Sequence, residues 1–208
     1  MSLDTIRAVE TLSFPPMRFS DDPEFVVFDT EWTAWEGSMA RDWSGPGEYR
    51  ELVQVGAVKL DALTLEETDR LELMVRPRFN PVLSDYFKDL TGIKQSRVDR
   101  EGLDLPEALD RFATFMTPEG WGASNGGDDV IMRENAELYG LEFPLANATF
   151  TNLRPILVER TGIPRPRLVT GQLDSVLGFT CDLAAHDALA DARKLAEALR
   201  VLRGRGQI

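Results

Sequence analysis

The chain contains very little of two residue types on which many catalytic and structural sites depend. Its 208 residues include one cysteine and one histidine. The single cysteine, Cys181, excludes an internal disulfide and is typical of a protein from a reducing compartment. The single histidine, His186, is weak evidence for chemistry unless other side chains supply a site beside it.

Positive charge is also scarce. Lysine and arginine together number 23 against 35 aspartates and glutamates, which gives a formal net charge of -12. This balance argues against a protein held on nucleic acid by diffuse positive charge. It does not exclude an enzyme that meets a phosphate backbone through bound cations, because a carboxylate cluster is negative until cations fill it.

Long apolar runs are absent, so no segment is expected to cross a membrane. The start, MSLDTIRAVETLSFPPMRF, lacks the basic-then-apolar order of a signal peptide. These features predict a soluble cytoplasmic protein. The helix breakers in FPP and SDDP predict an irregular lead-in over residues 1–22, and the remaining length fits a single domain over 23–208.

Apolar, β-rich runs dominate the first part of that domain. They predict strands over residues 24–32, 50–61 and 69–78, with a hairpin-like connection between the second and third. The first strand should be central in its sheet. Residues 33–49 are rich in Gly, Ser and Trp and predict a long loop.

Helical patterns follow, interrupted by two short strands. Helices are expected from Leu83 within residues 80–93, and over 104–116, 128–140, 154–162, 170–179 and 187–204, with strands at 120–125 and 148–153. Strands first, then strands alternating with helices, indicate an α/β fold with a mixed sheet.

The first strand ends in FDTE. Side chains alternate along a strand, so Asp29 and Glu31 share one face and Thr30 points to the other. Two buried acids on one face repel each other unless a cation lies between them, and a hard divalent ion suits oxygen ligands. The alternative is a surface pair where the strand leaves the core.

A second acidic motif, SNGGDDVIMREN, opens the helix predicted at 128–140. Asp128 or Asp129 could be a plain helix cap, which is the commoner role of an acid in this position. Ile131 and Met132 lie three and four residues after Asp128, so Asp128 shares their inward face and Asp129 turns toward solvent.

The third motif is HDALADA, residues 186–192. On a continuous helix His186 and Asp191 would lie on different faces. If Asp187 caps the last helix, His186 lies in the preceding loop and leans over the first turns, while Asp191 projects from the second turn. The alternative is a solvated helix start with one chance histidine.

These three motifs, in this order, resemble the DEDDh group of 3′→5′ exonucleases in the DnaQ-like superfamily. The resemblance covers residues 24–203 and includes ELVQVGAVKLD as a second strand and LTGI at 90–93. LYGLEFP after the middle helix is similar to the histone-mRNA-exonuclease-like branch. The resemblance implies a ribonuclease H-like α/β fold, a five-stranded mixed sheet flanked by helices.

The resemblance also implies roles for individual residues. Asp29, Glu31, Asp128 and Asp191 would hold two divalent metal ions, Mg²⁺ or Mn²⁺, and His186 would be the general base. The implied reaction is hydrolysis of single-stranded RNA or DNA from its 3′ end. The pair in GGDD leaves Asp129 open as the third carboxylate. A homodimer is also left open, because many members of the group dimerise.

The substrate contacts are less defined by sequence. The backbone after Glu31 and the LTGI segment are expected to hold the terminal nucleotide, which makes candidates of Thr30, Trp32, Thr33, Leu90 and Ile93. Trp32 and Trp35 could stack on bases, or they could anchor the loop. Four arginines could contact phosphates or be solvated surface charge: Arg76, Arg78, Arg97 and Arg100.

Two other functions remain compatible with these motifs. An inactive nucleic-acid-binding scaffold on the same fold would be expected to lack one of the five groups, and all five are present. A metal-dependent phosphodiesterase acting on another nucleotide would use the same ions with a different pocket. Preference for RNA or DNA depends on a 2′-hydroxyl contact that the sequence does not place.

Overall fold

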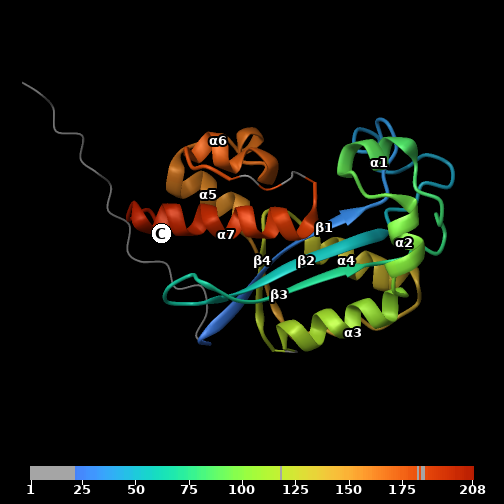
Figure 1. Cartoon of the computed structure of the whole chain (residues 1–208), viewed down its shortest axis with the longest axis horizontal. Helices are drawn as coiled ribbons and strands as arrows, with labels where there is room; N and C mark the ends of the chain where they lie inside the picture. Colours follow the sequence, from blue (N-terminus) through green and yellow to red (C-terminus); the bar gives the residue numbers. More distant parts are fainter. Residues whose placement is uncertain (1–21, 118, 182, 184–185) are drawn as a thin grey trace, which may run out of the picture.

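The computed structural model describes residues 22–117, 119–181, 183 and 186–208; the predicted lead-in at 1–22 lies outside this part of the chain except for Asp22. A five-stranded sheet forms the centre of the molecule, in the order β3–β2–β1–β4–β5 (Figure 1). Strands β1, β2 and β3 are antiparallel, and β1, β4 and β5 are parallel. The predicted mixed sheet and the central place of its first strand are therefore confirmed. The strands are β1 (Glu24–Trp32), β2 (Leu52–Asp61), β3 (Glu67–Met74), β4 (Trp121–Ser124) and β5 (Thr149–Asn152).

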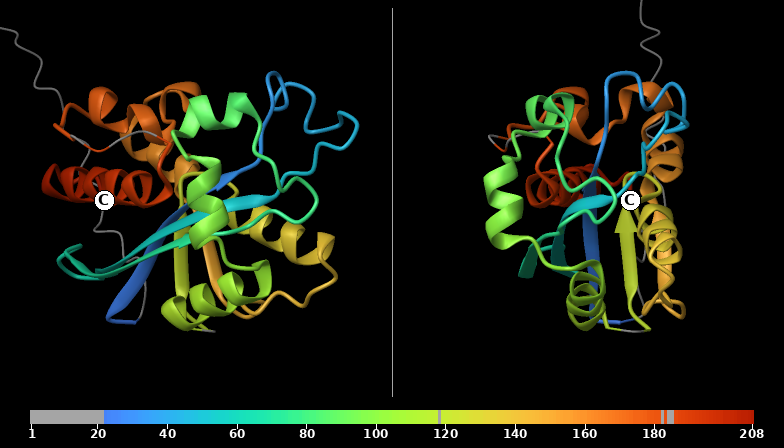
Figure 2. Two further views of the ribbon diagram at one scale, coloured as in Figure 1. Left: turned by 45° about the vertical axis from the view of Figure 1, so that its right-hand side comes forward. Right: turned by 90° about the vertical axis from the view of Figure 1, so that its right-hand side faces the viewer.

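Helices cover the sheet and extend past its ends (Figure 2). They are α1 (Asp85–Thr91), α2 (Gln95–Glu101), α3 (Leu105–Met116), α4 (Asp128–Leu138), α5 (Leu153–Thr161), α6 (Leu173–Leu177) and α7 (Ala188–Gly204), with short 3₁₀ turns η1 (Arg165–Arg167) and η2 (Thr170–Gln172). Each predicted helix is present, and α2 is an addition to them. The helix expected at 170–179 is divided between η2 and α6. No helix in the described ranges has the length and apolar character that crossing a bilayer requires.

Alternation along β1 separates two hydrophobic layers. Phe25 and Val27 pack in the layer that includes α5, α6 and α7, whereas Val26 and Phe28 pack in the layer of α3 and α4. The same alternation continues past Phe28. Consequently Asp29 and Glu31 follow the α7 face of the sheet, and Thr30 follows the α4 face.

Strand β3 ends at Met74, so the prediction that it continues to residue 78 is wrong. Pro77 has no N–H to donate to a strand partner. Beyond it, the N–H groups of Arg78, Phe79 and Asn80 donate to the buried carboxylate of Glu51, at 2.8, 2.9 and 2.6 Å. Glu51, the residue before β2, thus accepts hydrogen bonds from N–H groups that a longer β3 would donate to a neighbouring strand.

Candidate active site and metal centre

A cleft of about 650 Å³ opens at the carboxyl end of β1. It brings together segments that are far apart in the sequence: the end of β1, the start of α4 and the start of α7. The five residues of the predicted catalytic set all line it: Asp29, Glu31, Asp128, His186 and Asp191. The structure therefore gathers the three acidic motifs in one place.

The carboxylates in this cleft are hard to ionise together. Burial, and then the nearby charge of Asp128, raise the pKa of Asp29 well above its ordinary value. Burial, and then the carboxylate of Asp191, raise the pKa of Glu31 to about 8. Burial is also the leading cause of the raised pKa of both Asp128 and Asp191. A group of acids held in this way favours a bound cation.

The structure distinguishes the two aspartates of GGDD. Asp128 is buried, and its Oδ1 accepts hydrogen bonds from the backbone N–H and the hydroxyl of Thr30 at 3.1 and 2.8 Å. Asp129 is partly exposed and lies 3.9 Å from Arg133 on the same helix. The cleft therefore receives Asp128, as the apolar phase of the helix predicts. The N-cap of α4 is Gly127, so neither acid is the cap.

The HDALADA segment has the arrangement predicted from its spacing. Asp187 is the N-cap of α7, and its Oδ1 accepts from the N–H of Ala190 at 3.0 Å. His186 lies in the preceding loop, exposed, with a left-handed φ of 60°. Its backbone N–H donates to Asp191 Oδ2 at 3.1 Å. Asp191 thus holds the loop that carries the imidazole.

The donor atoms in the cleft fit a divalent cation. Asp191 Oδ1 is buried and has no hydrogen-bond partner within the described part of the chain. One ligand atom each from Glu31, His186 and Asp191 lie within 4.8 Å of one another. Carboxylate oxygens are the ligands that hard divalent ions prefer. An unsatisfied buried carboxylate oxygen beside two further ligand groups is the feature that a metal ion would satisfy.

A glycine in β2 allows the start of α7 to approach the sheet. Gly56 pairs with Asp29 in the β1–β2 register. A Cβ added at Gly56 would lie 2.0 Å from the backbone N of Leu189. Gln54 secures the same contact, because its Nε2 donates to Asp187 Oδ2 at 3.1 Å and its Oε1 accepts from the N–H of Ala188 at 3.0 Å. Asp191 is thereby carried to the face of the sheet that bears Asp29 and Glu31.

Gly56→Ala should destabilise the protein by about 1–3 kcal/mol, because the methyl group would overlap helix backbone rather than a flexible side chain. Urea unfolding measures this loss. Gly204→Ala, at a position where an added Cβ has no neighbour within 4 Å in the described structure, is the matched control and should be neutral or slightly stabilising. Equal stability of the two variants would contradict the close approach of α7 to β2.

The predicted substrate contacts divide into two groups. Thr30, Trp32 and Leu90 line the cleft. Thr33 and Ile93 are buried outside its lining: the hydroxyl of Thr33 donates to the carbonyl of Tyr49 at 2.6 Å, and Ile93 packs in the cluster beneath α1 and α2.

Two residues without a predicted role stand beside Leu90 on the same wall of the cleft. Met39 and Tyr86 are 80% and 42% exposed, and Leu90 is 39% exposed. Met39 lies in the 33–49 loop and Tyr86 in α1, and no sequence motif marks either of them for this wall.

The tryptophans of the 33–49 loop mainly hold it in place. Trp43 Nε1 donates to the carbonyl of Thr33 at 2.8 Å, and the Trp43 ring meets the Trp32 ring edge-on at 6.4 Å between centroids. Both rings also reach the lining of the cleft. Trp35 is not part of that lining. The contacts of Trp43 therefore support the alternative that tryptophans anchor this loop.

Arg154 is a cleft residue that sequence reasoning missed. It lies at the start of α5, and its guanidinium donates to the backbone carbonyl of Asn125. Its positive charge lowers the pKa of Asp29, opposing the effect of burial. An arginine opening a helix carries no sequence signal for this place, because the contact depends on packing between β4 and α5.

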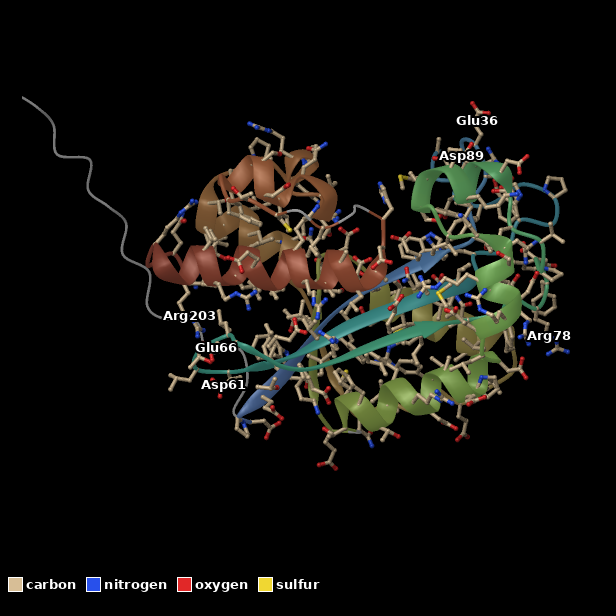
Figure 3. The ribbon with its side chains drawn as sticks, viewed as in Figure 1. Glu36, Asp61, Glu66, Arg78, Asp89 and Arg203 are labelled. Atoms are coloured by element: carbon tan, nitrogen blue, oxygen red, sulfur yellow. The ribbon has the colours of Figure 1, made fainter. Side chains whose placement is uncertain are left out.

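The four arginines considered from sequence lie outside the lining of the cleft. Arg97 and Arg100 pair with Glu101, and Arg76 lies 3.7 Å from Asp104. Arg78 stands at the edge of the molecule, pointing outward (Figure 3).

Comparison with known protein families gives one model that spans most of the chain. The RNase T family model, whose description is "Exonuclease", matches residues 26–199. Among curated proteins, 3'-5' exoribonuclease 1 from Homo sapiens is 28% identical over 187 residues, which cover 85% of this chain and 51% of that protein. ERI1 exoribonuclease 3 from Bos taurus is 29% identical over 109 residues, 52% of this chain and 29% of that protein. The chain thus spans about half the length of the first relative and less than a third of the length of the second.

Solved structures share the fold. The nuclease domain of 3'hExo, described as a DEDDh family member bound to rAMP, superposes with a TM-score of 0.76 at 25% identity, covering 89% of this chain and 94% of that one. Exonuclease I of E. coli, in complex with a dA16 oligonucleotide, gives a TM-score of 0.67 at 14% identity, covering 88% and 41%. The second likeness concerns the fold alone.

Proposed function

The chain belongs to the RNase T exonuclease family, and from this premise we propose that it is a metal-dependent 3′→5′ exonuclease acting on single-stranded RNA or DNA. Its five-stranded mixed sheet has the ribonuclease H-like architecture of that family's DEDDh members. The observation that carries the proposal is the gathering of four carboxylates and the only histidine in one cleft. The family uses divalent metal ions, and the donor atoms here suit them.

We assign the metal ligands to the four acids of the cleft. Asp29, Glu31, Asp128 and Asp191 would hold two ions, and Mg²⁺ or Mn²⁺ is the choice that fits oxygen donors. Such ions, when bound, stabilise both the attacking and the leaving oxygen of a phosphodiester. Thr30 contributes by fixing one oxygen of Asp128, so that this carboxylate is oriented before any ion binds.

His186 is the proposed general base. It is exposed at the cleft, and imidazole is the side chain most often used as a general base. Two contacts position it: Asp187 fixes the start of α7, and Asp191 Oδ2 holds the backbone N–H of His186. The backbone of the proposed base is therefore hydrogen-bonded to a proposed metal ligand.

The terminal nucleotide would lie against the apolar wall of the cleft. Leu90, Tyr86 and Met39 present exposed apolar surface there. Apolar and aromatic side chains pack on any base without reading its identity. Removal of successive nucleotides from a strand of any sequence requires that tolerance.

Incubation with Mn²⁺ and single-stranded oligonucleotides tests the function directly. RNA and DNA strands labelled at the 5′ end should give a ladder that shortens from the 3′ end, and strands labelled at the 3′ end should release the label first. Curated relatives are called exoribonucleases, so RNA is the first polymer to test. Internal cuts, or no cutting of either polymer, would overturn the proposal. The second of these outcomes would favour an inactive scaffold or a phosphodiesterase acting on another nucleotide.

Mg²⁺ should raise the melting temperature of the metal-free protein by about 5–10 °C at 100 times its dissociation constant. The physical reason is relief of repulsion among the buried carboxylates. Differential scanning fluorimetry measures the shift, and Asp29→Asn is the matched variant that should lose most of it. The same shift in Asp29→Asn and the parent would count against a metal site at Asp29.

The size of this shift should depend on pH. The pKa of Glu31 is raised from 4.5 to about 8 in the folded chain. Protonated Glu31 therefore stabilises the metal-free fold fully below pH 4.5, and this contribution is lost as the pH rises through 8. The metal-free protein should lose stability as the pH rises from 4.5 to about 8, and the Mg²⁺ shift should grow over that range. A shift that shrinks with rising pH would contradict ion binding at this carboxylate.

Location and assembly stay predictions. We propose a cytoplasmic protein, on the basis of its single cysteine. Self-association into a homodimer, suggested by the family resemblance, is tested by sedimentation velocity.

A further inference from the structure

Two exposed arginines stand beside the cleft without acidic partners. Arg165 and Arg167 form the ends of η1, and neither makes an ion pair with any residue that the structure describes. Most other surface arginines are paired: Arg41, Arg50, Arg97, Arg100, Arg111, Arg193 and Arg200 each contact a glutamate. In a chain with a net charge of -12, unpaired cations at one place are an unusual distribution.

This segment is joined directly to the active-site cleft. Asn125, at the end of β4, donates through Nδ2 to the carbonyl of Leu168 at 2.9 Å and to Thr170 Oγ1 at 3.1 Å. Arg154 donates to the backbone carbonyl of the same asparagine. The residues that follow η1, from Val169 to Gln172, line the cleft. Asn125 therefore links Arg154, in the cleft, to the segment that follows Arg167.

One arginine of the cleft and the two of η1 are here named the arginine ridge: Arg154, Arg165 and Arg167. Arg154 lies at the cleft, where burial, and then the positive charge of Arg165, lower the pKa of its guanidinium. Guanidinium groups gathered in one region create a positive potential that attracts an anion such as a phosphate. The ridge thus begins near Asp29 and Asp128 and leads outward to solvent.

The opposite rim of the cleft has the reverse character. Its lining is apolar at Met39, Tyr86 and Leu90, and Figure 3 shows Glu36 and Asp89 on the outer side of that rim, in the 33–49 loop and α1. A strand with one phosphate per nucleotide is repelled from acids and attracted to arginines. The two rims therefore differ in what they can hold: bases on one and phosphates on the other.

We propose that the arginine ridge holds the phosphate backbone of the substrate strand on the 5′ side of the nucleotide being removed. This inference rests on the proposed exonuclease function and names the path of the strand away from the cleft. Arg154 contacts the phosphates nearest the cleft, and Arg165 and Arg167 contact those farther along. The partner is the backbone of a single-stranded nucleic acid, recognised by charge and without regard to base sequence.

Salt dependence gives this proposal a quantitative test. For single strands, each neutralised phosphate contributes about -0.7 to the slope of log affinity against log salt concentration. The double variant Arg165→Gln/Arg167→Gln should therefore have a slope shallower by about 1.4, with affinity lower by on the order of tenfold at about 0.1 M salt. Fluorescence anisotropy with a labelled 20-nucleotide strand, in Ca²⁺ and over a series of NaCl concentrations, measures both quantities.

A matched control removes the same charge elsewhere. Arg100→Gln/Arg111→Gln takes two exposed, glutamate-paired arginines from α2 and α3 and should leave the slope within about 0.3 of the parent. The loss of affinity in Arg165→Gln/Arg167→Gln should be greater for a 20-nucleotide strand than for a dinucleotide. It should be similar for oligo(A) and oligo(U). Melting temperatures of both variants, measured alongside, confirm that each is folded.

The outcomes separate the two proposals. If the parent neither binds nor shortens a strand, the exonuclease function is wrong. If the parent is active and both double variants lose affinity equally, general charge is responsible and the ridge is wrong. An unchanged slope in the ridge variant overturns the inference as well, whereas the expected selective loss supports it.

Discussion

Replacing His186 with alanine should lower kcat by about 10²- to 10⁴-fold, the range supplied by a positioned general base. The imidazole is the only one in the chain, and it stands at the cleft on a loop held by Asp191. Stopped-time assays on a labelled single strand with saturating Mn²⁺ measure the loss. Turnover within threefold of the parent would contradict the role of His186 as general base.

A second role for His186 has to be separated from the first. Its ring lies within 4.8 Å of ligand atoms of Glu31 and Asp191, so it could be a metal ligand instead. A general base can be removed without loss of metal, so His186→Ala should keep the Mg²⁺-induced rise in melting temperature. If that rise disappears together with activity, His186 is a ligand.

Backbone conformation at this position requires a further variant. The φ of His186 is 60°, which alanine adopts at a cost of about 1–2 kcal/mol and asparagine adopts more readily. His186→Asn should therefore keep the loop geometry while removing the base. Similar losses of kcat in the Ala and Asn variants would assign the effect to the imidazole. Full activity in His186→Asn would assign it to the loop.

Asp128→Asn should reduce kcat by about 100-fold or more, because a lost carboxylate ligand removes several kcal/mol of charge stabilisation. The neighbouring Asp129→Asn should retain activity within about twofold, because Asp129 is partly exposed and contacts only Arg133 among its charged neighbours in the described structure. The two variants differ by one position and remove the same charge.

Ion binding provides the second measurement for this pair. Asp128→Asn should require a higher Mn²⁺ concentration for half-maximal activity, whereas Asp129→Asn should titrate as the parent does. The Thr30 hydroxyl can still donate to an amide oxygen, so folding of Asp128→Asn should be preserved. A larger effect from Asp129→Asn than from Asp128→Asn would reverse the assignment of the third carboxylate.

Local patterns predicted most of the elements of the fold and the faces of the acidic residues, whereas the resemblance of the three motifs to a family joined those residues into one site. Alternation along FDTE placed Asp29 and Glu31 on one face, and β1 has that arrangement. Helical phase favoured Asp128 over Asp129, and only Asp128 is buried in the cleft. These predictions succeeded because periodicity and capping act over a few residues, and sequence records them directly.

Features that depend on distant contacts were missed. Helix α2 has the sequence QSRVDRE with a single buried residue, Val98, so no apolar periodicity marks it. The early end of β3 depends on Glu51, which precedes it by more than twenty residues. Arg154 enters the site through Asn125, a contact between two segments that have no pattern in common. Sequence spacing alone does not give such contacts.

The close fit of α7 against Gly56 has a consequence for the order in which activity appears during synthesis. Ribosomes deliver the chain from its amino end, and His186 and Asp191 emerge well after Asp29, Glu31 and Asp128. Until α7 has been made and has packed on β2, the nascent chain carries three of its acids with neither the fourth nor the base. The proposed activity therefore requires that nearly the whole domain has left the ribosome.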